Sequence, residues 1–410
     1  MKPKIIFSEG KKDWVKRPLL SNIDKILDYR GRTPKKLGLS WSDTGYLALS
    51  ALNVKNGYID FNADANYGDQ ELYDRWMGDN HLHKGQVVFT TEAPMGNVAQ
   101  IPNDDLYILS QRTIAFEVKH NLIREDFLAT LLRSQKIFNE LTSLSSGGTA
   151  KGVSQKSLSN LKVCLPTSLE EQSAIGSLFR TLDDLLASYK ENLANYQSLK
   201  TTMLSKIFPK AGQTVPEIRL NGFEGEWEIK KFKSISTKRG KSNSKGYDYP
   251  AYSVSNQSGL IPQSEQFEGS RLENLEKTSY KIVEPNEFAY NPARINVGSI
   301  AFNDLGETVI VSSLYVIFLL DKSIDNNYAL LFIKSPEFNK EVRRNTEGTV
   351  REYLFYENFA NIRIPIPPSL EEQQAIGAYF SNLDNLINSY QEKITQLEAL
   401  KKKLLQDMFI

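Results

Sequence analysis

Residues 168–209 have the sequence SLEEQSAIGSLFRTLDDLLASYKENLANYQSLKTTMLSKIFP, and residues 369–410 have the sequence SLEEQQAIGAYFSNLDNLINSYQEKITQLEALKKKLLQDMFI. The two align without a gap, and about 19 of the 42 positions are identical. Upstream the match is weaker, although Trp14 and Trp227 still correspond. Similarity at a fixed interval indicates an internal duplication. The chain is therefore predicted to contain a module and a helix, followed by a second module and a second helix.

Each repeated stretch carries apolar residues spaced alternately four and three residues apart. They are Ile175, Phe179, Leu182, Leu186, Tyr189, Leu193, Tyr196, Met203 and Ile207 in the first copy, and Ile376, Phe380, Leu383, Ile387, Tyr390, Ile394, Leu397, Leu404 and Met408 in the second. This period is typical of a coiled coil. Ser168 and Ser369, each followed three residues later by Glu, predict where the helices begin. We expect the two helices to pair with each other; the alternative is that each stripe packs its helix on its own module.

Length and composition indicate an ordinary globular protein of two or more domains. The only cysteine, Cys164, excludes an internal disulfide and fits a reducing cytosol. The first residues lack the apolar core of a signal peptide. The longest apolar run, residues 309–320, is short and interrupted by Ser312 and Ser313, which predicts a buried strand and not a membrane span. A cytoplasmic location is therefore expected.

The formal net charge is only +1, but basic residues cluster early in each module. Both clusters contain an Arg-Gly step followed by a base and a hydroxyl, Arg30-Gly31-Arg32-Thr33 and Arg239-Gly240-Lys241-Ser242. Such donors suit phosphates and guanine edges. A charge run is often only a solvated surface, yet its recurrence in both modules favours nucleic acid. The candidate DNA-contacting residues are Arg30, Arg32, Thr33, Lys35, Lys36, Thr91, Arg112 and Lys151 in the first module, and Lys238, Arg239, Lys241, Ser242, Arg294, Asn296 and Arg351 in the second.

The sequences of the two modules predict the same order of elements. Each module is expected to be a mixed α+β domain of about 150 residues. An entry strand and the basic loop come first, followed by a hairpin at 46–59 or 249–261. A strand at 107–118 or 309–320 precedes a helix at 124–141 or 326–344. A Gly-Thr loop at 148–149 or 348–349 then leads to a last strand that ends at prolines.

Three patterns that suggest catalysis or a metal are judged accidental. Glu117-Val118-Lys119 after two aspartates approaches a nuclease layout, but the second module has Leu319-Leu320-Asp321 there. Asn291-Pro292-Ala293-Arg294 lacks the aromatic residue that amino-methyltransferases stack on the target base, and no Gly-rich cofactor loop accompanies it. His81 and His83 have no third metal ligand nearby. No catalytic, metal or cofactor site is expected in this chain.

The order of these parts resembles the specificity subunit of type I restriction–modification enzymes. The residues that match are Leu165-Pro166-Thr167-Ser168-Leu169-Glu170-Glu171-Gln172 with Ala174-Ile175-Gly176, and Pro367-Pro368-Ser369-Leu370-Glu371-Glu372-Gln373 with Ala375-Ile376-Gly377. The start of the second module also matches, with Pro216-Glu217-Ile218-Arg219-Leu220, Gly222-Phe223 and Trp227. The resemblance covers essentially the whole chain.

The resemblance implies two tandem target recognition domains, each of which recognises one half of a split site in double-stranded DNA. Two long antiparallel coiled-coil helices would separate them in a pseudo-two-fold repeat. The helices would set the spacer and dock two adenine-N6 methyltransferase subunits, through which restriction subunits join. The expected ranges are 1–165 and 213–366 for the domains, 166–212 for the central helix and linker, and 367–410 for the last helix. The expected partner-binding residues are Leu182, Leu186, Tyr189, Leu193, Leu383, Ile387, Tyr390 and Ile394.

The chain itself would hold no cofactor, and S-adenosylmethionine, ATP and Mg²⁺ are expected in the partner subunits. The modules differ, for example at Ser110-Gln111-Arg112 against Ser312-Ser313-Leu314, so the two half-sites should differ and the site should not be a palindrome. The bases recognised also depend on loop geometry and DNA shape. The alternatives are a structural coiled-coil adaptor without DNA readout, and a stand-alone DNA nuclease or methyltransferase.

Overall fold

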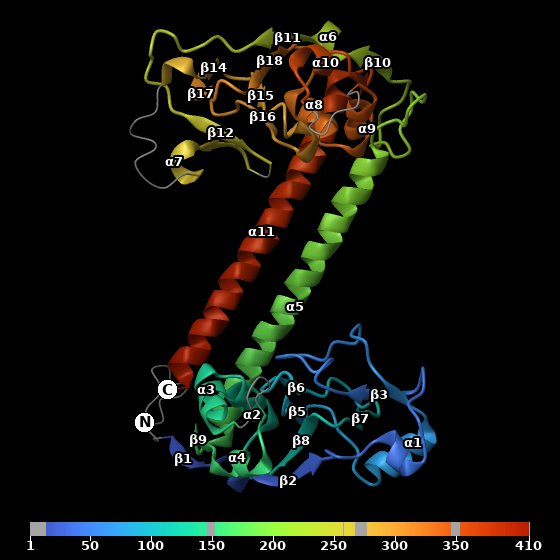
Figure 1. Cartoon of the computed structure of the whole chain (residues 1–410), viewed down its shortest axis with the longest axis vertical. Helices are drawn as coiled ribbons and strands as arrows, with labels where there is room; N and C mark the ends of the chain where they lie inside the picture. The colour runs from blue at the N-terminus through green and yellow to red at the C-terminus, as the bar shows by residue number, and fades with distance from the viewer. Residues whose placement is uncertain (1–13, 146–151, 257, 267–276, 346–352, 410) are drawn as a thin grey trace. The chain divides into compact units, whose positions relative to one another are not determined.

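A computed structural model describes residues 14–145, 152–256, 258–266, 277–345 and 353–409 (Figure 1). The chain divides into two compact units. Unit 1 consists of Met1–Glu191 and Glu392–Ile410, and unit 2 consists of Asn192–Gln391. Each unit therefore contains one module, called module 1 or module 2 below, together with parts of both long helices.

Module 1 is built on a four-stranded antiparallel sheet in the order β2-β8-β5-β6. A smaller sheet has the order β4-β3-β7, and β1 pairs with β9. The strands are β1 (Val15–Pro18), β2 (Ile23–Asp28), β3 (Tyr46–Leu49), β4 (Tyr67–Gly68), β5 (Val87–Thr90), β6 (Val98–Gln100), β7 (Ile108–Leu109), β8 (Thr113–Val118) and β9 (Lys162–Leu165). The helices are η1 (Leu19–Asn22), η2 (Pro34–Leu37), α1 (Gln70–Met77), α2 (Glu125–Leu132), α3 (Gln135–Leu144) and α4 (Gln155–Asn160).

Module 2 repeats this plan with a central antiparallel sheet in the order β11-β18-β15-β16. Its strands are β10 (Glu228–Lys231), β11 (Ser236–Arg239), β12 (Tyr252–Ser255), β13 (Gly259–Pro262), β14 (Lys281–Val283), β15 (Phe288–Tyr290), β16 (Ile300–Phe302), β17 (Val309–Val311), β18 (Val316–Leu320) and β19 (Arg363–Ile366). Its helices are α6 (Phe232–Ile235), α7 (Gln263–Gln266), η3 (Lys277–Ser279), η4 (Ile295–Val297), α8 (Asn326–Ile333), α9 (Pro336–Asn345) and α10 (Tyr356–Phe359). The predicted pair of mixed α+β modules is confirmed.

The central strand of each sheet is buried on both faces. Val88 lies opposite Ala99 and Ala115, and Ala289 lies opposite Ala301 and Ile317 at the same place in module 2. One face of β5 packs against α2 and α3 in the larger core of unit 1, and its other face packs against the core that contains α1. Strands buried on both faces are mostly apolar along their whole length, which explains the sequence Val87-Val88-Phe89.

The two long helices are α5 (Leu169–Lys206) and α11 (Leu370–Met408), and they begin where the capping pattern predicts. The Ser168 hydroxyl accepts a hydrogen bond from the Glu171 N–H at 3.1 Å, and Ser369 caps α11 in the same way at 3.2 Å. In unit 1, Lys190 pairs with Glu398 at 2.6 Å. In unit 2, the rings of Tyr196 and Tyr390 lie 5.5 Å apart. A residue further along α5 contacts a residue nearer the start of α11, because Lys190 contacts Glu398 whereas Tyr196 contacts Tyr390. The helices therefore pair antiparallel.

The apolar stripe of each helix both pairs the two helices and packs its helix on a module. Ile175, Phe179 and Leu182 of α5 belong to the core of unit 1, together with Met408 and Phe409 from the end of α11. Unit 2 is built in the same way, and its core contains Ile376, Phe380 and Leu383 with Ile207 and Phe208. The expected pairing of the two helices is confirmed, and each stripe also packs its helix on a module. The start of each helix covers its own module, because the sheet and its short helices leave an apolar face that needs covering.

Several predicted elements are divided in the structure. The helix expected at 124–141 is broken into α2 and α3, because Ser134 caps a new helix by accepting from the Ile137 N–H at 3.4 Å. The strands expected at 107–118 and 309–320 are each two short strands in different sheets. The hairpin at 249–261 is confirmed as β12 and β13. In 46–59, by contrast, β3 pairs with β4 and β7, and the expected hairpin is reduced to an isolated bridge between Val54 and Ile59. The Gly-Thr loops lie outside the described residues. Within the described ranges, no helix is long and apolar enough to span a bilayer.

Candidate nucleic-acid interface

The Arg-Gly loop of module 1 follows β2, and its first arginine is held by a neighbouring carboxylate. The Nε of Arg30 donates to both carboxylate oxygens of Asp28, at 2.9 and 3.0 Å, and its Nη1 donates to the Val153 carbonyl at 3.3 Å. The Gln155 amide also donates to Asp28 at 3.0 Å. Burial alone would raise the pKa of Asp28, but these hydrogen bonds and the charge of Arg30 hold that pKa below its ordinary value. Arg30 is therefore positioned and not a freely moving side chain.

The rest of this loop is a compact turn with exposed cations. The guanidinium of Arg32 lies over the Tyr29 ring, 4.7 Å from its centroid. Thr33 accepts a hydrogen bond from the Lys36 N–H at 3.2 Å and so begins η2, while the Lys36 ammonium donates to the Gly31 carbonyl at 2.6 Å. The side chain of Lys35 is exposed.

Two further candidates of module 1 lie beside this loop, in different roles. Thr91 is buried, and its backbone N–H and its hydroxyl both donate to the Arg112 carbonyl, at 2.8 and 3.2 Å. Arg112 is exposed and pairs with Glu92 at 3.2 Å. The Val153 N–H donates to the Thr91 carbonyl at 2.9 Å. Thr91 therefore supports this surface from below. The remaining candidate of module 1, Lys151, lies outside the described residues.

In module 2 the basic segment begins on β11. Lys238 pairs with Glu357 at 2.6 Å and lies 5.8 Å from the centroid of the Tyr356 ring. The Nε of Arg239 is 3.7 Å from a carboxylate oxygen of Glu287, a buried group whose pKa is raised by that burial. Module 2 thus holds the strand before its Arg-Gly step against the segment that contains α10.

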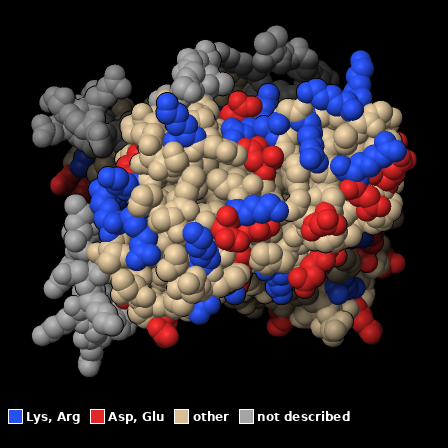
Figure 2. Space-filling model, turned by 90° about the horizontal axis from the view of Figure 1, so that it is seen from below, with Lys and Arg blue, Asp and Glu red and all other residues tan. Residues whose placement is uncertain are grey.

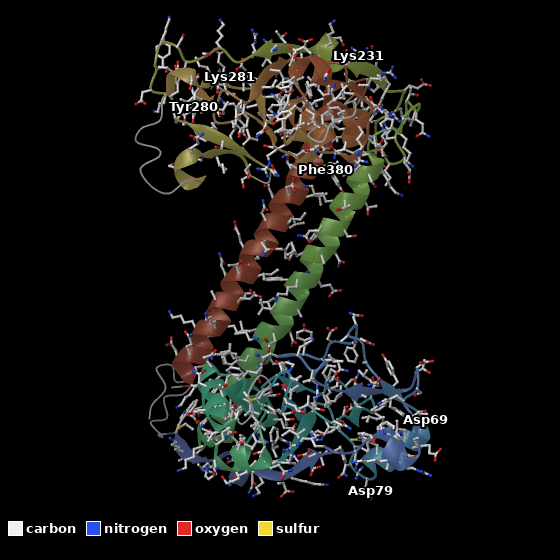
Figure 3. All side chains as sticks on the ribbon, in the orientation of Figure 1. Asp69, Asp79, Lys231, Tyr280, Lys281 and Phe380 are labelled. Atoms are coloured by element: carbon white, nitrogen blue, oxygen red, sulfur yellow. The ribbon has the colours of Figure 1, made fainter. Side chains whose placement is uncertain are left out.

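The remaining candidates of module 2 occupy two neighbouring segments. The Lys241 carbonyl accepts from the Ile282 N–H at 2.9 Å, and Ser242 bridges to Lys281 of β14. Figure 3 shows Lys281 on β14, well away from Phe380, which lies where α11 enters the core of unit 2. Arg294 and Asn296 are exposed on the turn around η4. Arg351 lies outside the described residues.

One backbone contact organises both modules in the same way. The Leu354 N–H donates to the Pro292 carbonyl at 2.9 Å, and these positions lie 201 residues beyond Val153 and Thr91. We call the surface made by residues 28–36, 112 and 152–155, with Thr91 buried beneath it, interface 1. The surface made by residues 236–242, 292–296 and 353–357 is called interface 2. The structure thus brings together most of the described candidate DNA-contacting residues in one region of each module.

The charge of interface 1 is mixed. The strand β2 and helix α4 lie on the side of unit 1 away from the long helices (Figure 1). Figure 2 views unit 1 from that side and shows Lys and Arg gathered in patches between Asp and Glu. Arg30 and Arg112 of interface 1 have acidic partners, and so does Lys238 of interface 2. Bound phosphates would therefore have to compete with these carboxylates.

The expected partner-binding residues of the helices face inward. Leu182, Leu186, Leu383 and Ile394 are buried, and Tyr189, Leu193, Ile387 and Tyr390 are partly buried. They hold the helices to each other and to the modules. The exposed apolar surface of these helices is formed by other residues, among them Leu185, Leu199 and Leu400.

The repeated motif at the start of each long helix fastens that helix to its module, a role that the sequence reasoning missed. The buried Gln172 accepts from the Arg124 N–H at 2.8 Å and donates to the carbonyls of Leu122 and Pro166 at 3.1 and 2.9 Å. In unit 2, Gln373 accepts from the Asp325 N–H at 2.9 Å and donates to the Ser323 carbonyl at 3.2 Å. The signal was available, because the glutamine is identical in both copies.

The neighbouring Glu and Gly of this motif serve the same purpose. Glu171 accepts a hydrogen bond from the Trp14 indole at 3.1 Å, and Glu372 pairs with Arg219 at 2.7 Å. A Cβ added at Gly176 would lie 2.4 Å from the Cβ of Asp126, so only glycine lets α5 approach α2 this closely.

The lysines that interrupt the apolar stripes form ion pairs across the helix pair. In unit 1, Lys401 pairs with Asp183, which also accepts from Arg133 at 2.5 Å. In unit 2, Lys200 pairs with Asp384. Since both lysines and both aspartates are 201 residues apart, the two ion pairs are copies of each other, and they explain why both stripes break at the same point.

No group of three or more metal-binding side chains occurs among the residues that the structure describes. The two histidines that suggested a ligand pair have separate partners. His81 hydrogen-bonds to the Tyr73 hydroxyl at 2.7 Å, and His83 contacts Glu125 at 2.8 Å.

Comparison with known proteins gives consistent matches. The family model described as type I restriction modification DNA specificity domain matches residues 11–195 and again residues 224–399. The MjaVIII specificity subunit of Methanocaldococcus jannaschii is 24% identical over 316 residues, covering 73% of this chain and 72% of that protein. The putative MjaX specificity subunit of the same organism is 23% identical over 417 residues, covering 96% and 92%.

Solved structures show the same fold. The crystal structure of a type I restriction–modification S subunit from M. genitalium superposes with a TM-score of 0.61 at 16% identity, covering 100% of this chain and 99% of that chain. A chain from a study of complex assembly and conformational transition of the type I system gives 0.50 at 18% identity, covering 98% and 99%.

Proposed function

Because this chain belongs to the type I restriction–modification DNA specificity family, we propose that its two modules each recognise one half of a split, asymmetric site in double-stranded DNA. The chain is the non-catalytic recognition component of its complex. The observation that carries the proposal is the shared backbone contact of interfaces 1 and 2. The residues on either side of this contact differ between the two modules. Such a difference is expected if the two modules recognise different DNA sequences.

We further propose that α5 and α11 set the spacer between the half-sites and dock two adenine-N6 methyltransferase subunits, which join the restriction subunits. The helices have 38 and 39 residues, so they are about 57 and about 59 Å long at about 1.5 Å per residue. Leu199 and Leu400 are exposed and 201 residues apart, so they offer equivalent positions to two copies of one partner. S-adenosylmethionine, ATP and Mg²⁺ belong to the partner subunits in this proposal.

The test is to map methylated adenines in DNA exposed to the assembled complex. Residues 215–366 are then replaced by the equivalent module of a relative. We expect one half-site to change while the other half-site and the spacer stay the same. A change in both half-sites, or in neither, would contradict the assignment of one half-site to each module.

Salt dependence tests the contribution of interface 2. Lys238→Ala, Arg239→Ala and Lys241→Ala are combined, and DNA affinity is measured against salt concentration. The logarithmic slope should flatten by about one to three units, at about 0.9 for each phosphate that the variant no longer neutralises. The upper limit of about 2.7 applies if all three cations contact phosphates. The pairing of Lys238 with Glu357 favours a smaller change. The matched control, Lys238→Arg, Arg239→Lys and Lys241→Arg, keeps the charge and should keep the slope.

A further inference from the structure

Interface 2 exposes two aromatic rings that the function proposed so far does not use. Tyr353 is 45% exposed and Phe355 is 53% exposed. Their ring centroids lie 5.9 Å apart and their planes differ by 9°, so the rings are nearly parallel. Two large exposed aromatic side chains at neighbouring outward positions form an apolar surface that water solvates poorly.

The residue between the two rings holds this pair in place. Leu354 is buried and donates its N–H to the Pro292 carbonyl at 2.9 Å. Its own carbonyl accepts from the hydroxyl of the buried Tyr290 at 3.0 Å. The backbone beneath the rings is therefore attached on both sides to the frame of module 2. Rings presented by such a segment lose little conformational freedom when they bind.

Charged residues of both signs lie on the segments next to the rings. Lys238 lies against Tyr356 and Glu357, directly after the rings in sequence. Arg294 is exposed on the turn that follows Pro292. Exposed aromatic rings beside lysine and arginine suit nucleic acid, in which phosphates lie next to the flat faces of the bases.

Module 1 provides an internal comparison. Val153 makes the backbone contact that Leu354 makes in module 2, so the neighbours of Val153 occupy the positions of the two rings. Those neighbours are Gly152 and Ser154. A Cβ added at Gly152 would find its nearest atoms at 3.7 Å, so the backbone of module 1 has room for a side chain there. The aromatic pair is therefore a property of module 2 and not of the shared fold.

We propose that Tyr353 and Phe355 insert at a base step of the half-site recognised by module 2 and stack on a nucleobase that this step exposes. This inference rests on the proposed function, since it names how interface 2 contacts DNA. Apolar and aromatic wedges unstack base steps in this manner in other DNA-binding proteins. Module 1, with glycine and serine at these positions, contacts its half-site without such stacking.

The experiment places the residues of module 1 at the two ring positions of module 2, within the complete complex. Tyr353→Gly and Phe355→Ser give module 2 the residues of module 1. The affinity for a duplex with the mapped site should fall about tenfold to hundredfold, the range found for losing one base–aromatic stack. Tyr353→Phe with Phe355→Tyr keeps both rings and should keep the affinity. Tyr353→Leu with Phe355→Leu keeps an apolar wedge but loses the stacking, so it should bind more weakly than the native chain and more tightly than the Gly/Ser variant.

A direct measurement uses 2-aminopurine placed in turn at each position of the duplex site. Its fluorescence at one step of the module 2 half-site should differ between the complex with native rings and the Gly/Ser variant. The module 1 half-site should show no such difference. Thermal unfolding of the variant should match that of the native chain, because both rings are exposed and Leu354 is unchanged.

Three results would overturn the inference. The first is equal affinity of the Gly/Ser variant and the native chain. The second is native affinity of the Leu/Leu variant, which would show apolar contact without stacking. The third is loss of the methyltransferase subunits from the variant at unchanged DNA affinity, which would make the rings a protein-docking surface. A native complex that binds no DNA would instead refute the proposed function itself.

Discussion

Replacing Asp183 by alanine should destabilise unit 1 by about 2–3 kcal/mol. The carboxylate of Asp183 accepts from Arg133 at 2.5 Å and pairs with Lys401 of α11. The side chain of Arg133 is only 8% exposed, so without Asp183 its guanidinium would remain buried beside a second cation. Breaking a buried ion pair from one side costs about 3–5 kcal/mol, and exposed pairs contribute about 0–1 kcal/mol. Because Lys401 is partly exposed, the expected loss lies between these limits.

The duplication supplies the matched control. Asp384 makes the equivalent pair with Lys200 in unit 2, but its side chain is 49% exposed. Asp384→Ala should therefore cost less than about 1 kcal/mol. The comparison separates the effect of burial from that of the ion pair, since both aspartates occupy the same position of the repeat.

Urea unfolding followed by tryptophan fluorescence measures this difference. Trp14, Trp41 and Trp76 belong to unit 1 and report on the effect of Asp183→Ala, whereas Trp227 belongs to the core of unit 2 and reports on the effect of Asp384→Ala. Combining Asp183→Ala with Arg133→Met should recover part of the loss, because it removes the unpaired buried cation. Equal losses for Asp183→Ala and Asp384→Ala, or no recovery in the double variant, would refute the reasoning.

Three other outcomes are expected. Gly176→Ala should destabilise unit 1 by about 1–2 kcal/mol in urea unfolding, because the cost of overpacking outweighs a gain of about 1 kcal/mol in helix propensity. Gly377→Ala should cost less, because its new Cβ would lie 2.9 Å from the nearest atom, whereas the distance at Gly176 is 2.4 Å. The pKa of Asp28 is lowered in the folded chain, so its contribution is present above its unfolded pKa of about 4 and is lost as pH falls through the folded value. Asp28→Asn should therefore make stability between pH 2 and 6 less dependent on pH. Leu199→Ser with Leu400→Ser should reduce co-purification of the methyltransferase subunits while leaving thermal unfolding unchanged, and full recovery of those subunits would place docking elsewhere.

The sequence alone was sufficient for the duplication, for the start of both long helices and for the mixed modules. The capping serines act on N–H groups three residues away, and the heptad spacing depends on positions three and four residues apart. The repeated strands follow from apolar runs in the same way. Such signals involve neighbours in the chain, so they can be recognised before any tertiary contact is known. The same reasoning placed the Arg-Gly loops of both modules among the candidate DNA-contacting residues.

Only the tertiary structure decided what surrounds each candidate residue. Arg30 meets Val153, which is 123 residues away, and Lys238 meets Glu357, which is 119 residues away. Thr91 proved to be buried beneath interface 1, and the inner stripe of each helix was divided between the module cores and the helix pair. The exposed ring pair of Tyr353 and Phe355 depends on Leu354 being tied to Pro292 and Tyr290. Contacts between distant segments depend on how the whole chain packs, and no local pattern of residues records which segments will meet.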